Sequence, residues 1–256
     1  MAAEEHSPAI VLRTRDYLES DRIVTLITRD FGRLSGIARG AKVSRRRFER
    51  RLEPFSHVML RFRRRPHGEL MFIVRAEAEG LESFLLEHDL ARIAMGSYAL
   101  ELCEALTPEA DDASDVYTLL VEALRTLERA GAGAALRQAF EMHLLAACGL
   151  ALDFARCRLC GAPAALTAHP LAFVTERGGI ACARCRPAAG DAAVLLPGSD
   201  AAALAALSCA QLAQAPSLAA AGRAGAHALS RFIAASAGRR LRSVEFLERV
   251  AGQTAP

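Results

Sequence analysis

The 256-residue chain contains no tryptophan, and Lys42 is its only lysine among 32 Lys and Arg residues. Aromatic residues make up 5% of the chain, so a surface that stacks nucleic-acid bases has only Phe and Tyr to use. No apolar run reaches the ~18 residues that argue for a membrane span. Residues 1–8 lack the apolar core of a signal peptide. The chain is therefore expected to remain in the cytoplasm.

Sequence motifs of the common hydrolases are also missing. Gly40, Ala41 and Lys42 do not form a phosphate-binding loop, because no Gly-Lys-Ser/Thr follows. Neither G-x-S-x-G nor H-E-x-x-H occurs. The acidic residues Asp111, Asp112 and Asp115 cluster at the start of a predicted helix, where the helix dipole accounts for them. The sequence therefore predicts a protein that is not an enzyme.

Positive charge is concentrated near the amino end. Residues 1–80 carry 17 Arg and Lys against 11 Asp and Glu, a net +6, whereas residues 81–256 carry 15 against 18, a net −3. A polyanion is the expected partner of the first part. The candidate DNA-binding residues are the eleven cations of residues 39–65, called the basic segment: Arg39, Lys42, Arg45, Arg46, Arg47, Arg50, Arg51, Arg61, Arg63, Arg64 and Arg65.

Residues 8–80 have the pattern of short strands. Strands are predicted over residues 9–13, 22–28, 34–38, 58–63 and 69–78. In the fourth strand Val58, Leu60 and Phe62 alternate with Arg61 and Arg63, which predicts a half-buried strand with arginines outside. In the fifth, the residues expected to share one face are Leu70, Phe72 and Val74. Five short strands in about 70 residues favour a small closed barrel of the OB-fold kind.

From residue 84 onward the spacing of apolar residues becomes helical. Helices are predicted over residues 88–106, 115–130, 134–148, 199–214, 217–237 and 242–250. The expected fold class is α+β. An OB-fold domain covers residues 1–80, and a helical domain covers residues 81–256 with a zinc-ribbon-like insert at 157–185. Within the helices His143 is interpreted as a core or boundary residue.

Two C-x-x-C pairs stand between the predicted helices. Cys157 and Cys160 are separated from Cys182 and Cys185 by residues 161–181. This spacing suits four thiolates around one tetrahedral zinc ion, and a predicted hairpin over residues 171–180 would bring the pairs together. Four thiolates leave no open position for a catalytic water, so the predicted role of the zinc is structural.

Other interpretations of the cysteines stay open. Two disulfides or four free thiols are the alternatives, although paired thiols in a reducing cytosol favour a metal. His169 lies inside the segment and is a weaker substitute for one sulfur. The remaining cysteines, Cys103, Cys148 and Cys209, are interpreted as small buried apolar residues because each lies in an Ala/Leu-rich stretch.

The basic segment also has two interpretations. Its arginines can bind successive phosphates along a strand, and Phe31 or Phe48 can stack a base. Alternatively, the segment is a solvated, mobile loop that binds nothing specific. No base-reading motif is present, so little sequence preference is expected.

Several segments together resemble the bacterial RecO recombination-mediator family. Those near the amino end are residues 9–29, residues 32–41 and Leu52–Phe55. Cys148-Gly-Leu150, Cys157 to Gly161 and Gly178 to Cys185 resemble the zinc-bearing members, and Leu241–Leu247 resembles the family's tail. The resemblance covers most of the chain.

The resemblance implies an N-terminal OB-fold and a helical domain with a zinc element. It implies binding of single- and double-stranded DNA, annealing of complementary strands, and help in loading the RecA recombinase onto SSB-coated DNA, in association with the nucleoid. RecR and the SSB C-terminal tail are the implied partners. Two other functions compete with this one: a zinc-ribbon transcription regulator that prefers one duplex sequence, and a metal-dependent nuclease.

Overall fold

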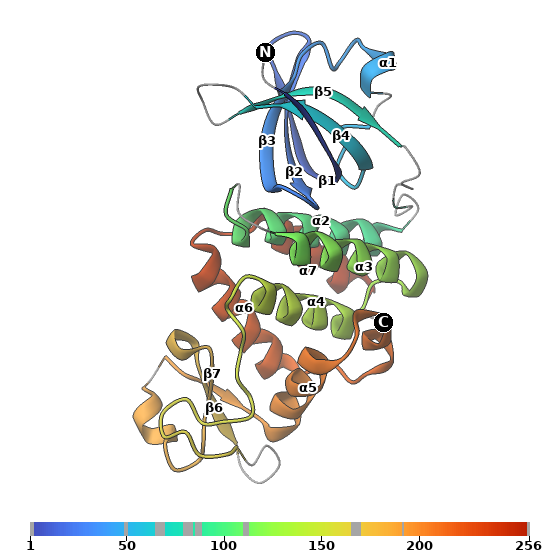
Figure 1. The fold of residues 1–256 in the computed structure, drawn as a ribbon. Helices are drawn as coiled ribbons and strands as arrows, with labels where there is room; N and C mark the ends of the chain where they lie inside the picture. Colours follow the sequence, from blue (N-terminus) through green and yellow to red (C-terminus); the bar gives the residue numbers. More distant parts are fainter. Residues whose placement is uncertain are drawn as a thin grey trace. The chain divides into compact units, whose positions relative to one another are not determined.

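A computed structural model describes residues 3–48, 51–64, 70–78, 84, 89–109, 113–164, 170–190 and 192–254 (Figure 1). The chain divides into two compact units. Unit 1 consists of residues 1–128 and 242–256, and unit 2 consists of residues 129–241. None of the described helices is long and apolar enough to cross a membrane.

Unit 1 begins with a closed barrel of five strands (Figure 1). The strands are β1 (Glu4–Tyr17), β2 (Asp21–Thr28), β3 (Gly32–Ala38), β4 (His57–Arg63) and β5 (Met71–Glu77). Their order is β1-β2-β3-β5-β4, and β4 pairs with β1 to close the barrel. All neighbours are antiparallel except β3 and β5. This OB-like barrel confirms the predicted fold class.

The barrel core follows the predicted alternation in β4, and in β5 the three residues predicted to share a face do so, although that face is not the core face. Val58, Leu60 and Phe62 are fully buried, as expected. In β5 the core residues are Met71 and Ile73. Their neighbours Leu70, Phe72 and Val74 share the other, half-buried face of the strand. Both faces of β5 are apolar, so alternation alone did not show which one faces the core.

Phe48 belongs to the core, which corrects the prediction that it stacks a base. The short helix α1 (Arg45–Phe48) lies between β3 and β4 in the chain. It turns the Phe48 ring inward, where Phe48 and Leu52 are each only 1% exposed and pack with the barrel residues. Phe31 is half-buried at the edge of this core, and its ring meets that of Phe62 edge-on at 5.3 Å.

Three helices complete unit 1: α2 (Leu90–Leu106), α3 (Ser114–Ala130) and α7 (Arg242–Thr254). The carboxylate of Asp89 caps α2 by accepting hydrogen bonds from the N–H groups of Ala91 and Arg92. The first N–H groups of α7, those of Arg242 and Ser243, donate to the Glu101 carboxylate on α2. Because this bond spans more than 140 positions, it fixes the end of the chain to the helix that follows the barrel.

Unit 2 contains helices and a small sheet. Its elements are α4 (Ala134–Ala147), β6 (Leu171–Val174), η1 (Thr175–Arg177), β7 (Gly179–Ala181), η2 (Arg186–Ala189), β8 (Val194–Leu196), α5 (Gly198–Cys209), η3 (Leu212–Ser217) and α6 (Arg223–Ala237). The hairpin β6–β7 confirms the predicted one. Strand β8, which pairs with β6, was not predicted because it has only three residues.

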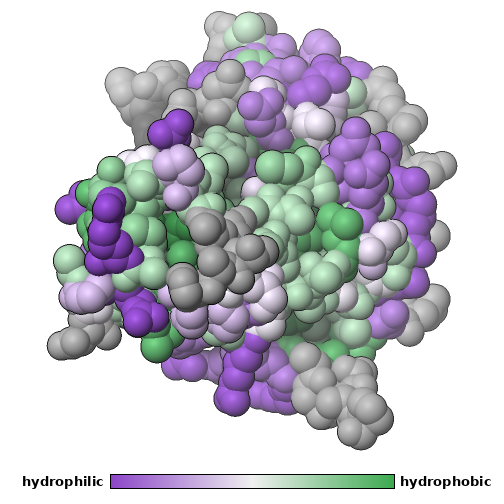
Figure 2. Space-filling model, turned by 90° about the horizontal axis from the view of Figure 1, so that it is seen from below, coloured by the Kyte–Doolittle hydropathy of each residue, from purple (hydrophilic) through white to green (hydrophobic). Residues whose placement is uncertain are grey.

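The helices of unit 2 depart from prediction after Cys209. Helix α5 ends there, and the 3-10 helix η3, which contains Pro216, follows in place of its expected last residues. Helix α6 begins at Arg223 rather than near 217. Cys209 is exposed and Cys148 is half-exposed, so only Cys103 is the buried residue expected. Figure 2 looks onto the end of unit 2 that carries the small sheet, and its pale green areas show much weakly apolar surface.

Candidate nucleic-acid interface and metal centre

The outer face of β4 and β5 carries arginines around one aromatic ring. Arg61 lies opposite Arg75 in the β4–β5 pairing, and Arg63 lies opposite Phe72. The guanidinium of Arg39, at the end of β3, lies over the Phe72 ring at 5.6 Å from its centroid. Phe72 is only half-buried. The face therefore offers guanidinium groups for phosphates and one ring surface for a base.

Phe72 is a candidate site residue that the sequence reasoning missed. Its strand has apolar residues on both faces, so the prediction did not assign it to the solvent side. The sequence did contain one indication. The predicted β4 carries arginines on its outer face, so the residues of β5 that pair with those arginines must also point outward. Phe72 thus replaces the buried Phe48 as an aromatic candidate, beside the predicted Phe31, whose half-buried ring lies under the Arg64 guanidinium at 5.5 Å.

Several predicted cations are already paired with carboxylates. The pairs are Arg61–Glu77 at 3.7 Å, Arg63–Glu4 at 3.0 Å, Arg64–Glu5 at 3.0 Å and Lys42–Asp16 at 3.0 Å. Arg75 also contacts Glu77, at 2.8 Å. Such exposed pairs contribute little to stability, so a phosphate can replace the carboxylate at small cost. The local charge is nevertheless lower than the number of arginines suggests.

The first part of the basic segment is held against the β1–β2 turn. The Asp21 carboxylate accepts a hydrogen bond from the Gly40 N–H at 2.8 Å, and this bond is the main reason that the pKa of Asp21 is lowered. Gly40 has a positive φ of 64°, which suits glycine. The Arg47 guanidinium donates to the Arg39 carbonyl at 2.7 Å. These contacts favour a defined surface over a mobile loop.

The remaining predicted residues divide into two groups. Arg51 is half-buried. Arg50 and Arg65 lie outside the described residues, and the side chains of Arg45 and Arg46 on α1 do as well.

Close to α1 the chain exposes three large apolar side chains at neighbouring turns: Tyr17 at 43%, Leu18 at 72% and Val43 at 77%. They border the basic segment, because Lys42 donates to the Leu18 carbonyl at 3.3 Å.

The four cysteines of the two C-x-x-C pairs meet in unit 2. The sulfur atoms of Cys157, Cys160, Cys182 and Cys185 all lie within 4.8 Å of one another. Cys160 Sγ and Cys182 Sγ are 3.9 Å apart. Zinc–sulfur bonds of about 2.3 Å at tetrahedral angles place sulfurs about 3.8 Å apart, so the cluster fits such an ion. His169 lies outside the described residues.

Hydrogen bonds within the cluster lower the pKa of two of its thiols and raise that of a third. Burial by itself would raise the pKa of Cys157, but the N–H groups of Cys182, Leu159 and Cys160 outweigh it and lower that pKa to about 6. The Ala162 N–H is the largest cause that lowers the pKa of Cys160. Hydrogen bonding with Cys160 is the largest cause that raises the pKa of Cys185 to about 12, so the Cys185 thiol holds its proton. A cation is the natural replacement for that proton.

The backbone around the cysteines explains how the pairs converge. Gly161 follows the first pair with a positive φ of 73°, a conformation that glycine adopts readily. Arg186 follows the second pair at the same relative position. It begins the 3-10 helix η2, so a positive φ is not needed there. Arg158 N–H donates to the Ile180 carbonyl at 2.8 Å and docks the first pair on β7. At Gly179 a Cβ would lie 2.5 Å from the Asp153 carbonyl, so only glycine allows this approach.

The geometry defines a class of protein: an OB-like barrel with a cationic outer face, joined to a helical unit that carries a closed four-cysteine cluster. Comparison with known proteins then gives the family. Residues 1–81 match the family model "Recombination protein O N terminal", and residues 87–245 match "Recombination protein O C terminal". The chain belongs to the RecO family, as the sequence resemblance predicted.

Curated relatives agree with this assignment. "DNA repair protein RecO" of Anaeromyxobacter sp. (strain Fw109-5) is 38% identical over 253 residues, which cover 94% of each chain. The protein of the same name from Myxococcus xanthus (strain DK1622) is 36% identical over 245 residues, covering 94% of this chain and 96% of the relative. The family consists of non-catalytic DNA repair mediators, which gives the chain a role in DNA repair and recombination and confirms that it is not an enzyme.

Proposed function

We propose that the barrel binds DNA strands through the outer face of β4 and β5 together with the basic segment. The single observation that carries the proposal is Arg39 stacked on the half-buried ring of Phe72, beside the arginines of β4. Arginine contacts with phosphates release counterions, and each contact is expected to contribute about −0.7 to the salt slope for a single strand. Residues 1–80 are then the DNA-binding domain.

The proposed work of this surface is strand annealing. Two phosphate backbones repel each other, and a cationic surface that binds both single and double strands lowers this repulsion while bases pair. In cells this activity would assist RecA loading on SSB-coated DNA at the nucleoid. RecR and the SSB C-terminal tail are the proposed protein partners, a proposal supported by membership of the family.

We also propose that the four cysteines hold one structural zinc ion. The donor set favours zinc because four thiolates suit a borderline-soft tetrahedral ion. Cys157, Cys160, Cys182 and Cys185 would supply all four ligands. The ion would connect the first C-x-x-C turn to the β6–β7 hairpin, which has a small apolar core of its own around Ala172, Val174 and Ala181.

Replacing Phe72 with alanine is expected to weaken single-strand binding by about 5- to 150-fold, because base–aromatic stacking contributes about 1–3 kcal/mol. The salt slope should stay the same, since no charge is removed. Fluorescence anisotropy of a labelled oligonucleotide at several salt concentrations measures both quantities. Phe72→Tyr is the matched control and should bind like the wild type. Unchanged affinity of the Phe72→Ala variant would show that Phe72 is not part of the interface.

An assay with complementary labelled strands, SSB and no nucleotide tests the function itself. Duplex should form faster with the protein than without it, and both strands should remain intact. Strand cleavage on addition of divalent metal would support a nuclease instead. Tight binding to one duplex sequence, without annealing, would support a transcription regulator.

A further inference from the structure

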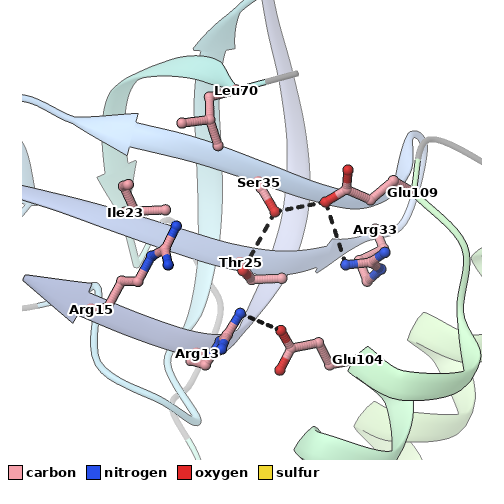
Figure 3. Close-up of a pocket in the computed structure, with 9 residues that line it drawn as sticks. All are labelled: Arg13, Arg15, Ile23, Thr25, Arg33, Ser35, Leu70, Glu104 and Glu109. Atoms are coloured by element: carbon pink, nitrogen blue, oxygen red, sulfur yellow. Dashed lines mark hydrogen bonds and ion pairs between the residues drawn. The ribbon is translucent and has the colours of Figure 1, made fainter. Parts of the chain in front are cut away.

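A polar pocket opens on the outer face of β1, β2 and β3, and Leu70, just before β5, also lines it (Figure 3). It measures about 230 Å³ and lies within unit 1. Its polar lining comes from three arginines, two glutamates and two hydroxyl residues: Arg13, Arg15, Arg33, Glu104, Glu109, Thr25 and Ser35. One water molecule needs about 10–15 Å³ of such cavity volume, so the pocket has room for a phosphate group and several waters.

A bulge in β1 creates this arginine cluster. Ala9 and Val11 face the barrel core, so regular alternation would also turn Arg13 and Arg15 inward. The β1–β2 register shifts between Val11 and Arg13, which adds one residue and reverses the facing. The two arginines therefore lie on the outer face, next to Thr25 of β2 and Ser35 of β3.

Two of the three guanidinium groups are bound by carboxylates of the segment that follows the barrel. Arg13 contacts Glu104 at 2.7 Å, and Arg33 contacts Glu109 at 3.4 Å while donating to the Thr107 carbonyl at 2.6 Å. These pairs have a structural explanation, because they connect the barrel to α2 and the residues after it. Three guanidiniums and two carboxylates leave a net charge of +1.

Arg15 is the unmatched charge. Among the described residues it makes no hydrogen bond or ion pair, although its side chain lines the pocket (Figure 3). The contacts that connect the barrel to α2 and the residues after it use only Arg13 and Arg33, so they do not require the Arg15 guanidinium. An exposed arginine beside two others raises the local potential and favours an anion.

Glu109 marks where an anionic oxygen is accommodated. One of its oxygens, Oε1, accepts from both Arg33 Nη1 at 3.4 Å and Ser35 Oγ at 2.9 Å (Figure 3). Thr25 Oγ1 lies 3.5 Å from Ser35 Oγ and extends this polar wall. The Glu109 side chain is 42% exposed, so it can leave the pocket without breaking a core contact. A phosphate oxygen in its place would receive the same two donors.

We propose that this pocket is a second phosphate site for a DNA strand, in which Arg15 is the available cation and Glu109 is an internal competitor. The inference rests on the proposed DNA binding of the barrel and adds a contact on β1, β2 and β3, beside the strand β5 that carries Phe72. A backbone phosphate bound in the pocket neutralises the excess charge. Glu109 then limits the affinity of the pocket for phosphate.

Binding of a labelled single strand at several salt concentrations tests the pocket in the full-length protein. Arg15→Ala is expected to lower affinity about 3- to 10-fold at low salt and to reduce the salt slope by about 0.7, the value for one phosphate contact. Glu109→Gln, which keeps an acceptor for Ser35 but removes the competing charge, is expected to raise affinity several-fold. Unchanged melting temperatures would show that both variants fold.

Arg223→Ala provides the control for loss of one positive charge. Arg223 is exposed at the start of α6 in unit 2, and among the described residues its side chain makes no hydrogen bond or ion pair. If Arg15→Ala and Arg223→Ala behave alike while Phe72→Ala still weakens binding, the pocket inference is wrong and the proposed function stands. If the wild type binds no strand even in dilute buffer, the proposed function fails as well.

Thymidine monophosphate tests whether the pocket binds a phosphate of a DNA strand or a free phosphate compound. Calorimetric titration of wild type and Arg15→Ala with this nucleotide is expected to show only weak binding. Tight nucleotide binding that Arg15→Ala abolishes, with the strand salt slope unchanged, would assign the pocket to a small phosphate ligand and overturn the strand site.

Discussion

Replacing Cys157 and Cys160 together with serine is expected to remove the metal and unfold the region around the β6–β7 hairpin. Half of the ligand set disappears, and binding free energy at a structural zinc site is folding free energy. A decrease of about 3 kcal/mol in the free energy of unfolding corresponds to a melting temperature about 6–12 °C lower in a chain of this size. Elemental analysis measures the metal, and circular dichroism measures the melting temperature.

Cys209→Ser is the matched control for this prediction. Cys209 is exposed at the end of α5 and lies outside the cluster, so the same chemical change should leave metal content and melting temperature unchanged. Affinity for DNA should change by less than about twofold in the double variant, because the barrel belongs to unit 1. A wild-type protein that contains no metal when purified under reducing conditions would contradict the zinc proposal.

Replacing Arg45, Arg46, Arg47, Arg50 and Arg51 with alanine is expected to cause the largest loss of DNA binding. If each side chain contacts one phosphate, the salt slope should become shallower by up to about 3.5, at about 0.7 per contact. By the same relation, affinity near 200 mM salt should fall by about two to three orders of magnitude, and by more at lower salt. Anisotropy titrations between 50 and 200 mM salt, the range over which such contacts are usually compared, measure both quantities.

Lysine at the same five positions is the control, since it keeps every charge. The lysine variant should retain the wild-type salt slope and most of the affinity if attraction to phosphate dominates. Arg47 is the position where lysine is expected to differ, because its guanidinium also bonds the Arg39 carbonyl and lies over the Phe48 ring. A wild-type salt slope in the alanine variant would exclude this segment from the interface.

The candidate metal site could be predicted almost completely from the sequence. Two C-x-x-C turns restrict four sulfurs to two short loops, and the hairpin between them has strong local signals in Leu171–Val174 and the glycines at 178 and 179. Local chain geometry alone therefore brings the pairs near each other. The approach of Gly179 to the Asp153 carbonyl could not be predicted, because it depends on packing between segments that are distant in sequence.

The candidate DNA interface was predicted as a charged region that includes one strand with arginines on its outer face, but without the partners of those arginines. Counting arginines identifies residues 39–65, but it does not show that Arg63 and Arg64 face Glu4 and Glu5 across a strand pair. Nor does it show that Arg13 and Arg15 gather on the outer face, because one extra residue in β1 reverses the alternation. Bulges and cross-strand partners arise from the whole sheet, so no local pattern reveals them.

The sequence by itself determined the change from strands to helices, the cysteine quartet, the uneven charge and the family. These properties depend on residue types and short spacings, which are present in the chain before it folds. Tertiary structure decided that Phe48 is buried while Phe72 lies on the surface, and which arginines already have carboxylate partners. Such outcomes depend on strand register and on contacts between distant residues, since a one-residue shift reverses the face on which every following side chain lies.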